Sequence, residues 1–156
     1  QVSTHIAPDE SAGELLGRLT ELSKTLLSQE LPKIYSGMSH EEVQSGKDSQ
    51  APKLSRDDAR IDTGKPALAI HNLIRAMNPE PVAWLKYKGE SFRILESRVQ
   101  NAIQTEEPGQ ILGGKTPVMV CGDGHGIELI KVQPFGKKVM SGADWFRGQT
   151  DLGRFR

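Results

Sequence analysis

The sequence predicts an α+β chain in which helices precede a small β-barrel. Two patterns support this fold class: leucines recur every three or four residues over 11–31, and about five short strand-like runs follow beyond Pro81. The leucine spacing is that of an amphipathic helix. Short strands separated by turns are typical of small barrels, of which the five-stranded oligonucleotide-binding (OB) barrel is the commonest template.

Local signals define the first helix. Ser11 and Glu14 form a capping box, in which each side chain accepts a hydrogen bond from a backbone N–H at the helix start. Pro32 lacks an N–H group and clashes with the preceding turn, so we expect it to kink or restart the helix before Gly37 ends it. The chain opens on a strand-like alternation over residues 2–6. We therefore expect the leucines to pack on a sheet of a longer protein, which this chain only begins to show.

A polar segment separates this helix from a second one. Residues 37–50 contain almost no apolar side chain and are interpreted as a loop or linker, and 51–62 lack a clean period and predict an extended strap over a surface. The second helix begins near Gly64, has Pro66 in its first turn and is stopped by Asn78-Pro79. Its apolar face consists of Ala67, Ile70, Leu73, Ile74 and Met77.

The barrel is predicted from runs of β-type residues and the turns between them. Lys88-Gly89 is compatible with a tight hairpin between the first two runs, and residues 123–126 suit the turn between the last two. Ser141 and Asp144 then cap a short terminal helix, whose Trp145 and Phe146 are expected to seal one end of the barrel. The five runs are VAWLKY, SFRILESRV, GQILGG, PVMVCG and GIELIKVQP.

Composition and spacing exclude several classes of function. No apolar run approaches the ~20 residues that cross a bilayer, and no signal peptide opens the chain, so no membrane partner is expected. Cys121 is the single cysteine, which excludes an internal disulfide or a cysteine-based zinc site and favours the cytoplasm. We predict neither a metal site nor a catalytic residue, since no nucleophile has a base at a recognisable spacing. The histidines, none at ligand spacing, are His5, His40, His71 and His125.

Charge is distributed unevenly along the chain. The total is zero, but residues 1–52 hold four basic and eight acidic side chains, whereas the remainder from Lys53 onward holds sixteen and twelve. A basic C-terminal part attracts polyanions, and the adjacent Lys137 and Lys138 in a loop are free to meet a phosphate. With Lys86, Lys88, Arg93 and Lys131 they give the barrel a positively charged side in one interpretation; in the other, these are solvated charges that discourage strand pairing.

Several segments resemble, in order, the methionyl-tRNA formyltransferases. The linker stretch is the strongest, and the last segment is similar to the closing Gln-Pro-x-Gly-Lys-Lys-x-Met of that family. Met77 and Glu80 depart from the pattern, because aromatic residues are common there. The matching segments are DESAGELLGRLTELSKTLL, APKLSRDDARID, LIRAMNPEPVAW, PGQIL and GDGHGIELIKVQPFGKKVMSGADWFRG.

The resemblance implies a monomeric enzyme that transfers the formyl group of 10-formyltetrahydrofolate to the amino group of methionyl-initiator tRNA in translation initiation. Residues 1–37 would be the tail of its Rossmann-like formyltransferase domain, 38–62 a linker, and 63–156 the C-terminal OB-like barrel that contacts tRNA. The family's catalytic asparagine, histidine and aspartate lie upstream of the segment that matches Gln1. We therefore expect this chain to bind tRNA, to be inactive alone and to hold no cofactor.

The resemblance implies that tRNA is contacted by basic residues of the linker, the second helix and the Gly-Lys-Lys loop. Phosphates and shape are the expected targets, since bases in an A-form stem are hard to reach. Arg75 has the alternative role of capping or salt-bridging the second helix. Two other functions remain open: a nucleic-acid-binding barrel without folate, and a formyltransferase for another substrate. The expected tRNA-binding residues are Lys53, Arg56, Arg60, Arg75, Lys137 and Lys138.

Overall fold

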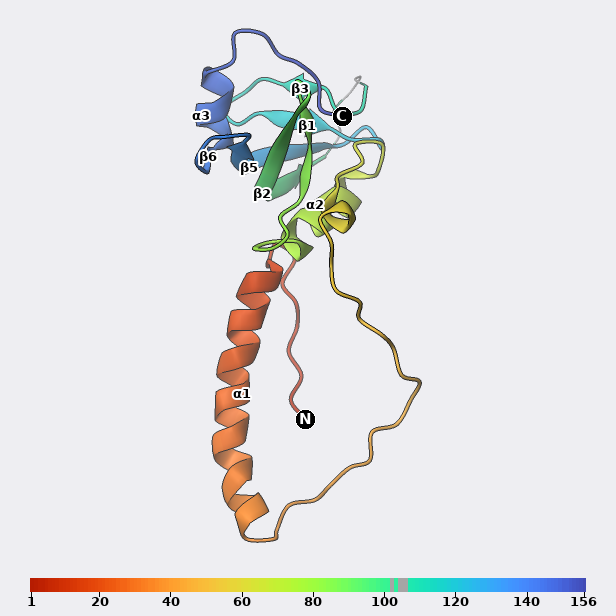
Figure 1. Cartoon of the computed structure of the whole chain (residues 1–156), viewed down its shortest axis with the longest axis vertical. Coiled ribbons are helices and arrows are strands. Elements are labelled where there is room, and N and C mark those ends of the chain that lie inside the picture. The colour runs from red at the N-terminus through yellow and green to blue at the C-terminus, as the bar shows by residue number, and fades with distance from the viewer. Residues whose placement is uncertain (102, 104–106) are drawn as a thin grey trace. The chain divides into compact units, whose positions relative to one another are not determined.

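The computed structural model describes residues 1–101, 103 and 107–156 and divides into two compact units, Gln1–Lys53 and Leu54–Arg156. The first unit contains one helix, α1 (Ala12–Tyr35), shown in Figure 1. Its capping box is confirmed: Ser11 N donates to the Glu14 carboxylate at 2.9 Å, and Glu14 N donates to Ser11 Oγ at 3.3 Å. In the described part of the chain, no helix has the length and apolarity to cross a membrane.

The structure differs from two expectations about this unit. The helix does not restart at Pro32 but continues to Tyr35, because a proline in the last turn removes little of the hydrogen-bond ladder; its carbonyl still accepts from Ser36 N at 3.1 Å. Gly37 ends the helix as expected, with φ +71°. Residues 2–6 form no strand, since a strand needs a hydrogen-bonded neighbour and the described residues of this unit contain none.

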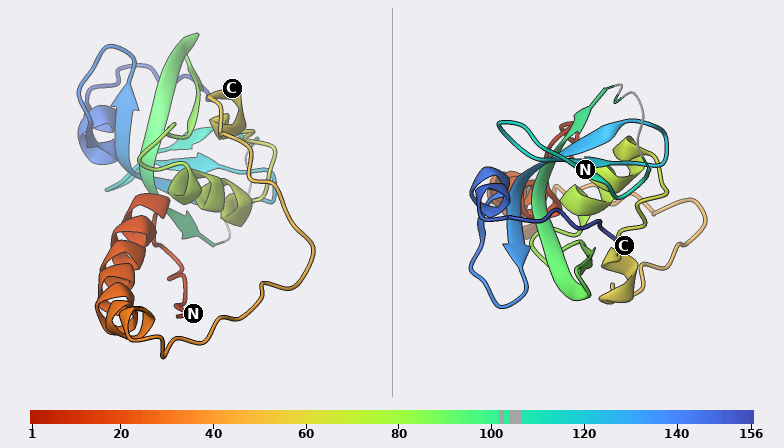
Figure 2. Two further views of the ribbon diagram at one scale, coloured as in Figure 1. Left: turned by 60° about the horizontal axis from the view of Figure 1, so that its bottom comes forward. Right: turned by 90° about the horizontal axis from the view of Figure 1, so that it is seen from above.

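The second unit is built on an antiparallel sheet with two helices. Within the described residues it has six strands in the order β1-β2-β5-β4-β3, with β6 paired to β5. The helix α2 packs on β2 and β5, and α3 packs on β5 and β6 (Figure 2). Its elements are η1 (Asp57–Ala59), α2 (Ala67–Ala76), β1 (Trp84–Tyr87), β2 (Glu90–Gln100), β3 (Ile111–Leu112), β4 (Val118–Val120), β5 (Gly126–Pro134), β6 (Met140–Ser141) and α3 (Gly142–Arg147).

Turn chemistry fixes the first hairpin as predicted. Lys88 and Gly89 both have positive φ, at +51° and +88°, which is the requirement of the two-residue turn that matches strand twist. This turn pairs Trp84 with Arg93 across β1 and β2. The α+β class and the five predicted runs are confirmed. The strand β6 was not predicted, because two residues are too short to show an alternation.

The strap of residues 51–62 is more deeply anchored than expected. Ala59 and Ile61 are buried in the same core as Ile70 and Ile74 of α2, and Ile61 N donates to Trp84 O at 2.8 Å. The strap is not extended throughout, because η1 interrupts it, and Ala59 and Ile61 anchor its second half in the core.

Four aromatic side chains form the centre of the core at the α3 end of the sheet. They are Tyr87, Phe92, Trp145 and Phe155, and their ring centroids lie 4.8 to 5.9 Å apart. Trp145 is buried, so this aromatic residue of the terminal helix packs inward as predicted. Ser141 caps that helix, accepting from Asp144 N at 3.0 Å. Phe155 enters the core from the end of the chain, a position that no sequence pattern indicated.

The glycine-rich turn at residues 122–126 caps a helix that is distant in sequence. The Asp123 carboxylate accepts from the first backbone N–H of α2, at Ala67, at 3.1 and 3.2 Å. It also accepts from His125 N at 3.2 Å and lies 3.0 Å from His125 Nδ1. Partial burial raises the pKa of Asp123, but these hydrogen bonds outweigh it and leave the pKa below its usual range.

We expect Asp123→Ala to lower the free energy of unfolding by about 1 to 2 kcal/mol at neutral pH, the usual effect of removing a helix cap. A folded-state pKa below the unfolded value means that this contribution is complete above about pH 4, the unfolded pKa, and is lost as pH falls through the folded pKa. Urea unfolding between pH 7 and pH 3 measures the difference from the parent. A difference that stays constant over this range would contradict the prediction. Asp151→Ala, at an exposed position, is the control.

Candidate nucleic-acid interface

A short turn positions the first basic residue of the strap. Ser55 N and Oγ donate to the Asp58 carboxylate at 2.8 and 2.7 Å, and Asp58 N lies 3.4 Å from Ser55 Oγ. The Ser55 bonds hold the pKa of Asp58 below its ordinary value, so the turn stays closed at neutral pH. Arg56 lies inside this turn and is exposed. The Ser-Arg-Asp-Asp sequence that resembles the family linker therefore also forms this hydrogen-bonded turn.

Trp84 brings two of the predicted arginines together. Its indole Nε1 donates to the Arg56 carbonyl at 2.7 Å. The Arg56 guanidinium lies 4.6 Å from the centre of the Trp84 ring, and that of Arg60 lies 5.8 Å from it. Arg60 also forms a parallel bridge with Trp84. Cation–π contacts of this kind hold both charges in place without neutralising them.

A hollow of about 240 Å³ connects the strap to the loop after β5. Arg56 Nη2 donates to Ser91 Oγ at 3.2 Å on one side of it. Arg93 Nη1 donates to Gln133 Oε1 at 3.3 Å, and Gln133 Nε2 donates to the Lys137 carbonyl at 3.2 Å. Neighbouring β2 and β5 pair Arg93 directly with Gln133, which is why residues 40 apart in sequence meet here. The lining residues are Arg56, Ser91, Arg93, Gln133, Pro134, Phe135 and Gly136.

The structure brings some of the predicted residues together but not all. Lys137 and Lys138 are exposed on the loop beside the hollow, where Gly136 has φ +67°. Lys53 is exposed at the end of the first unit and Arg75 is half-buried on α2, bonded to Asn72 Oδ1 at 2.9 Å. Neither lines the hollow. Arg93 does and was not among the expected contacts, although its outward position on a predicted strand was a usable signal.

Carboxylates pair with many basic side chains of the second unit but not with those of this site. Lys131 lies 3.0 Å from Glu96, Arg98 lies 3.8 Å from Glu128 and Lys88 lies 3.9 Å from Asp151; Arg147 and Arg154 are also paired. Among the described residues, no ion pair involves the five side chains that we call the basic face. They are Arg56, Arg60, Arg93, Lys137 and Lys138.

The described residues include few side chains placed to act as a nucleophile, an acid–base group or a metal ligand. Burial, with a smaller contribution from Asp123, raises the pKa of the Cys121 thiol to about 12, so it is not a nucleophile at neutral pH. The His71 side chain is buried and its Nδ1 lies 3.0 Å from Ser97 Oγ, joining α2 to β2. In the parts of the chain that the structure describes, no three His, Cys, Asp or Glu side chains are placed to hold a metal. The basic face is thus a surface suited to binding anions.

The family model described as "Formyl transferase, C-terminal domain" matches residues 53–150. The chain belongs to this family. It is 42% identical over 147 residues to the methionyl-tRNA formyltransferase of Arthrobacter sp. (strain FB24), covering 94% of this chain and 48% of that protein. It is 39% identical over 143 residues to the methionyl-tRNA formyltransferase of Paenarthrobacter aurescens (strain TC1), covering 92% and 47%. The chain thus spans about half the length of these curated relatives.

Solved structures agree with the fold. HypX from Aquifex aeolicus superposes with a TM-score of 0.70 at 14% identity, covering 93% of this chain and 27% of that one. Its complex with tetrahydrofolic acid gives a TM-score of 0.60, also at 14% identity, covering 83% and 26%. At this level of identity the likeness supports the architecture alone. The matched family domain and the sequence relatives carry the assignment to formyltransferases.

Proposed function

We propose that this chain is the C-terminal part of a methionyl-tRNA formyltransferase and that its basic face holds the backbone of initiator tRNA. One observation carries the proposal. Arg56 and Arg93 line one hollow, Lys137 is joined to it through Gln133, and none of the three is in an ion pair within the described residues. Unpaired, exposed cations gathered on one face are the expected surface for a polyphosphate backbone.

The geometry favours phosphates and sugars over base edges. Guanidinium groups present several N–H donors in one plane and suit phosphate oxygens, whereas the two lysines of the loop act as mobile point charges. The face consists of a strap, two strands and a loop, so no helix among the described residues carries its side chains into a groove of the nucleic acid. A-form RNA, whose deep groove is closed to side chains, is recognised mainly through its backbone and shape.

The remaining expectations belong to the same proposal. Residues 1–37 are the tail of the Rossmann-like formyltransferase domain, 38–62 the linker, and 63–156 an OB-like barrel. The upstream half of a longer protein binds 10-formyltetrahydrofolate and carries the reaction, in the cytoplasm and as a monomer. The family match and the relatives named methionyl-tRNA formyltransferase support the enzyme assignment rather than these bounds, since the matched domain begins at residue 53. Joining the chain to that half and assaying formyl transfer to methionyl-tRNA tests this part.

Substituting Lys137 by alanine is expected to weaken initiator tRNA binding and to lower the salt slope of the binding constant by about one unit, because one phosphate contact and its released counterion are lost. Filter binding or anisotropy from 50 to 300 mM salt, on the full chain, measures both. Lys131→Ala is the matched control, since that lysine is on β5 but is paired with Glu96 at 3.0 Å and adds little net attraction.

The same measurement applies to the other predicted contacts: Lys53, Arg56, Arg60, Arg75, Lys138 and, added by the structure, Arg93. A salt slope that is unchanged in every one of these single variants refutes the basic face as a phosphate-binding site. A slope lowered equally by Lys131→Ala shows instead that any positive charge on the unit suffices. Circular dichroism on each variant confirms that the fold is retained.

A further inference from the structure

Phe135 is an exposed aromatic residue at the edge of the basic face. It directly follows the last residue of β5, 67% of its surface is exposed, and Gly136 turns the chain immediately after it. Among the described residues of the second unit, it is the one exposed aromatic side chain; the others are buried or half-buried. Tyr87, Phe92 and Trp145 show that aromatic rings of this unit otherwise pack in the core.

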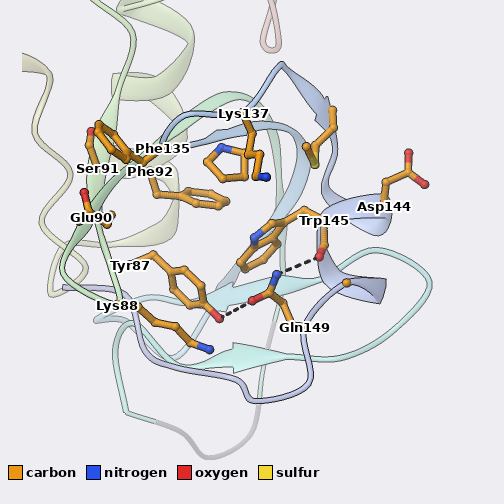
Figure 3. A pocket seen from close by; sticks show the side chains of 13 residues that line it. Tyr87, Lys88, Glu90, Ser91, Phe92, Phe135, Lys137, Asp144, Trp145 and Gln149 are labelled. Atoms are coloured by element: carbon orange, nitrogen blue, oxygen red, sulfur yellow. Dashed lines mark hydrogen bonds between the residues drawn. The ribbon is translucent and has the colours of Figure 1, made fainter.

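Phe135 lines two hollows of different chemistry. The first is the hollow that Arg56 and Arg93 also line. The second is a pocket of about 520 Å³, shown in Figure 3, with Phe92 and Trp145 in its lining, Lys137 at the loop and two carboxylates, Glu90 and Asp144. Phe135, Pro134 and Ser91 line both. An exposed aromatic ring therefore shares each hollow with cationic side chains.

We propose that Phe135 stacks on an unpaired base of the bound RNA, while Arg56, Arg93 and Lys137 hold the phosphates on either side of that base. This inference rests on the proposed function and specifies the kind of RNA segment that docks at this face. Single strands are usually recognised by aromatic side chains placed among cationic groups. The aromatic ring stacks on the π-face that every base has, and the cations bind the charged phosphate of each linkage. In a duplex both faces of a base are already stacked, so a loop, a bulge or a single-stranded end is selected.

A protein partner is less suited to this face. An aromatic residue exposed for a protein interface is expected to sit in a patch poor in charge, because interface cores are depleted of charged residues. Here the neighbours of Phe135 in the hollow are two arginines without carboxylate partners among the described residues. A second copy that docked by the same face would bring like positive charges together and be repelled.

The test compares Phe135→Ala with the parent chain on three fluorescent RNAs of equal length: a single strand, a hairpin with an unpaired loop and a blunt duplex. We expect the substitution to weaken binding to the first two by about five- to one-hundredfold, to leave duplex binding unchanged and to leave the salt slope unchanged, because no charge is removed. Phe135→Trp should restore binding. Val139→Ala, which removes an exposed apolar side chain of the same loop, is the matched control and should have no effect.

The outcomes separate this inference from the proposed function. If Lys137→Ala weakens binding and Phe135→Ala does not, stacking is wrong and the phosphate-binding face stands. If neither variant changes binding to any RNA, both proposals fail. An equal loss on the duplex and on the single strand also overturns stacking, as does a dimer, detected by sedimentation, that Phe135→Ala dissociates.

Discussion

Phe92→Ala is expected to lower the free energy of unfolding of the second unit by about 3 to 5 kcal/mol, the usual range for deleting a fully buried phenylalanine. Its side chain is 1% exposed and its ring centroid lies 4.8 Å from that of Trp145 and 5.1 Å from that of Phe155. The cavity left behind would border α3, β1 and the end of the chain at once. Since whole domains are stable by about 5 to 15 kcal/mol, this loss is a large share of the total.

Urea unfolding followed by tryptophan fluorescence measures this loss, because Trp145 packs directly on Phe92. Phe135→Ala is the matched control: it deletes the same side chain at an exposed position, where surface substitutions change stability by about 0.5 kcal/mol or less. A Phe92→Ala variant that unfolds at the same urea concentration as Phe135→Ala would contradict the central role of the aromatic cluster.

Gly142→Ala is expected to destabilise the second unit by about 3 kcal/mol or more, the upper end of the effect of overpacking. This glycine begins α3 and is buried, and a Cβ atom added to it would lie 1.7 Å from the Leu129 carbonyl oxygen. A backbone oxygen in β5 cannot move aside as the tip of a side chain does. The helix would have to lift from the sheet, taking Trp145 with it.

Thermal and urea unfolding of Gly142→Ala measure this effect, with Gly148→Ala as the control at the other end of the same helix. There a Cβ would meet its nearest neighbour, the Trp145 carbonyl oxygen, at 3.5 Å, which is ordinary contact, and φ is −82°. Equal stability of the two variants would show that α3 is free to shift away from β5. In that case the close packing at Gly142 would not be a structural requirement.

Local chemistry is the part of the fold that could be predicted from the sequence. The Ser11 capping box, the Lys88-Gly89 turn and the Ser141 cap each depend on residues at most three positions apart. The amphipathic period likewise located α1 and α2. What the sequence did not reveal depends on distant partners. The cap of α2 comes from Asp123, 56 residues away, and Phe155 enters the core without any local pattern.

The candidate site likewise contains residues that could be predicted from the sequence and residues that could not. Arg56, Arg60, Lys137 and Lys138 are expected from the linker and loop motifs. The structure joins the two arginines at the Trp84 ring, and Gly136, next to Lys137, lines the same hollow as Arg56. The sequence does not show that Trp84 holds the two arginines, because a tryptophan in a strand-like run is indistinguishable from a core residue until its neighbours are known. The sequence groups Arg93 with other basic residues on predicted strands but does not show its link to Gln133, which depends on the pairing of two strands.

The contact of two guanidinium groups with the Trp84 ring has a kinetic consequence. Arg56 and Arg60 are held against the Trp84 ring before any ligand arrives, so fewer rotamers are lost when an anion docks on them. The two lysines that follow Gly136 have no such support, and their long flexible stems chiefly extend the positive field into solvent. For a passing polyanion, the lysine loop would then set how fast encounter occurs, and the restrained arginines would set how long the complex lasts.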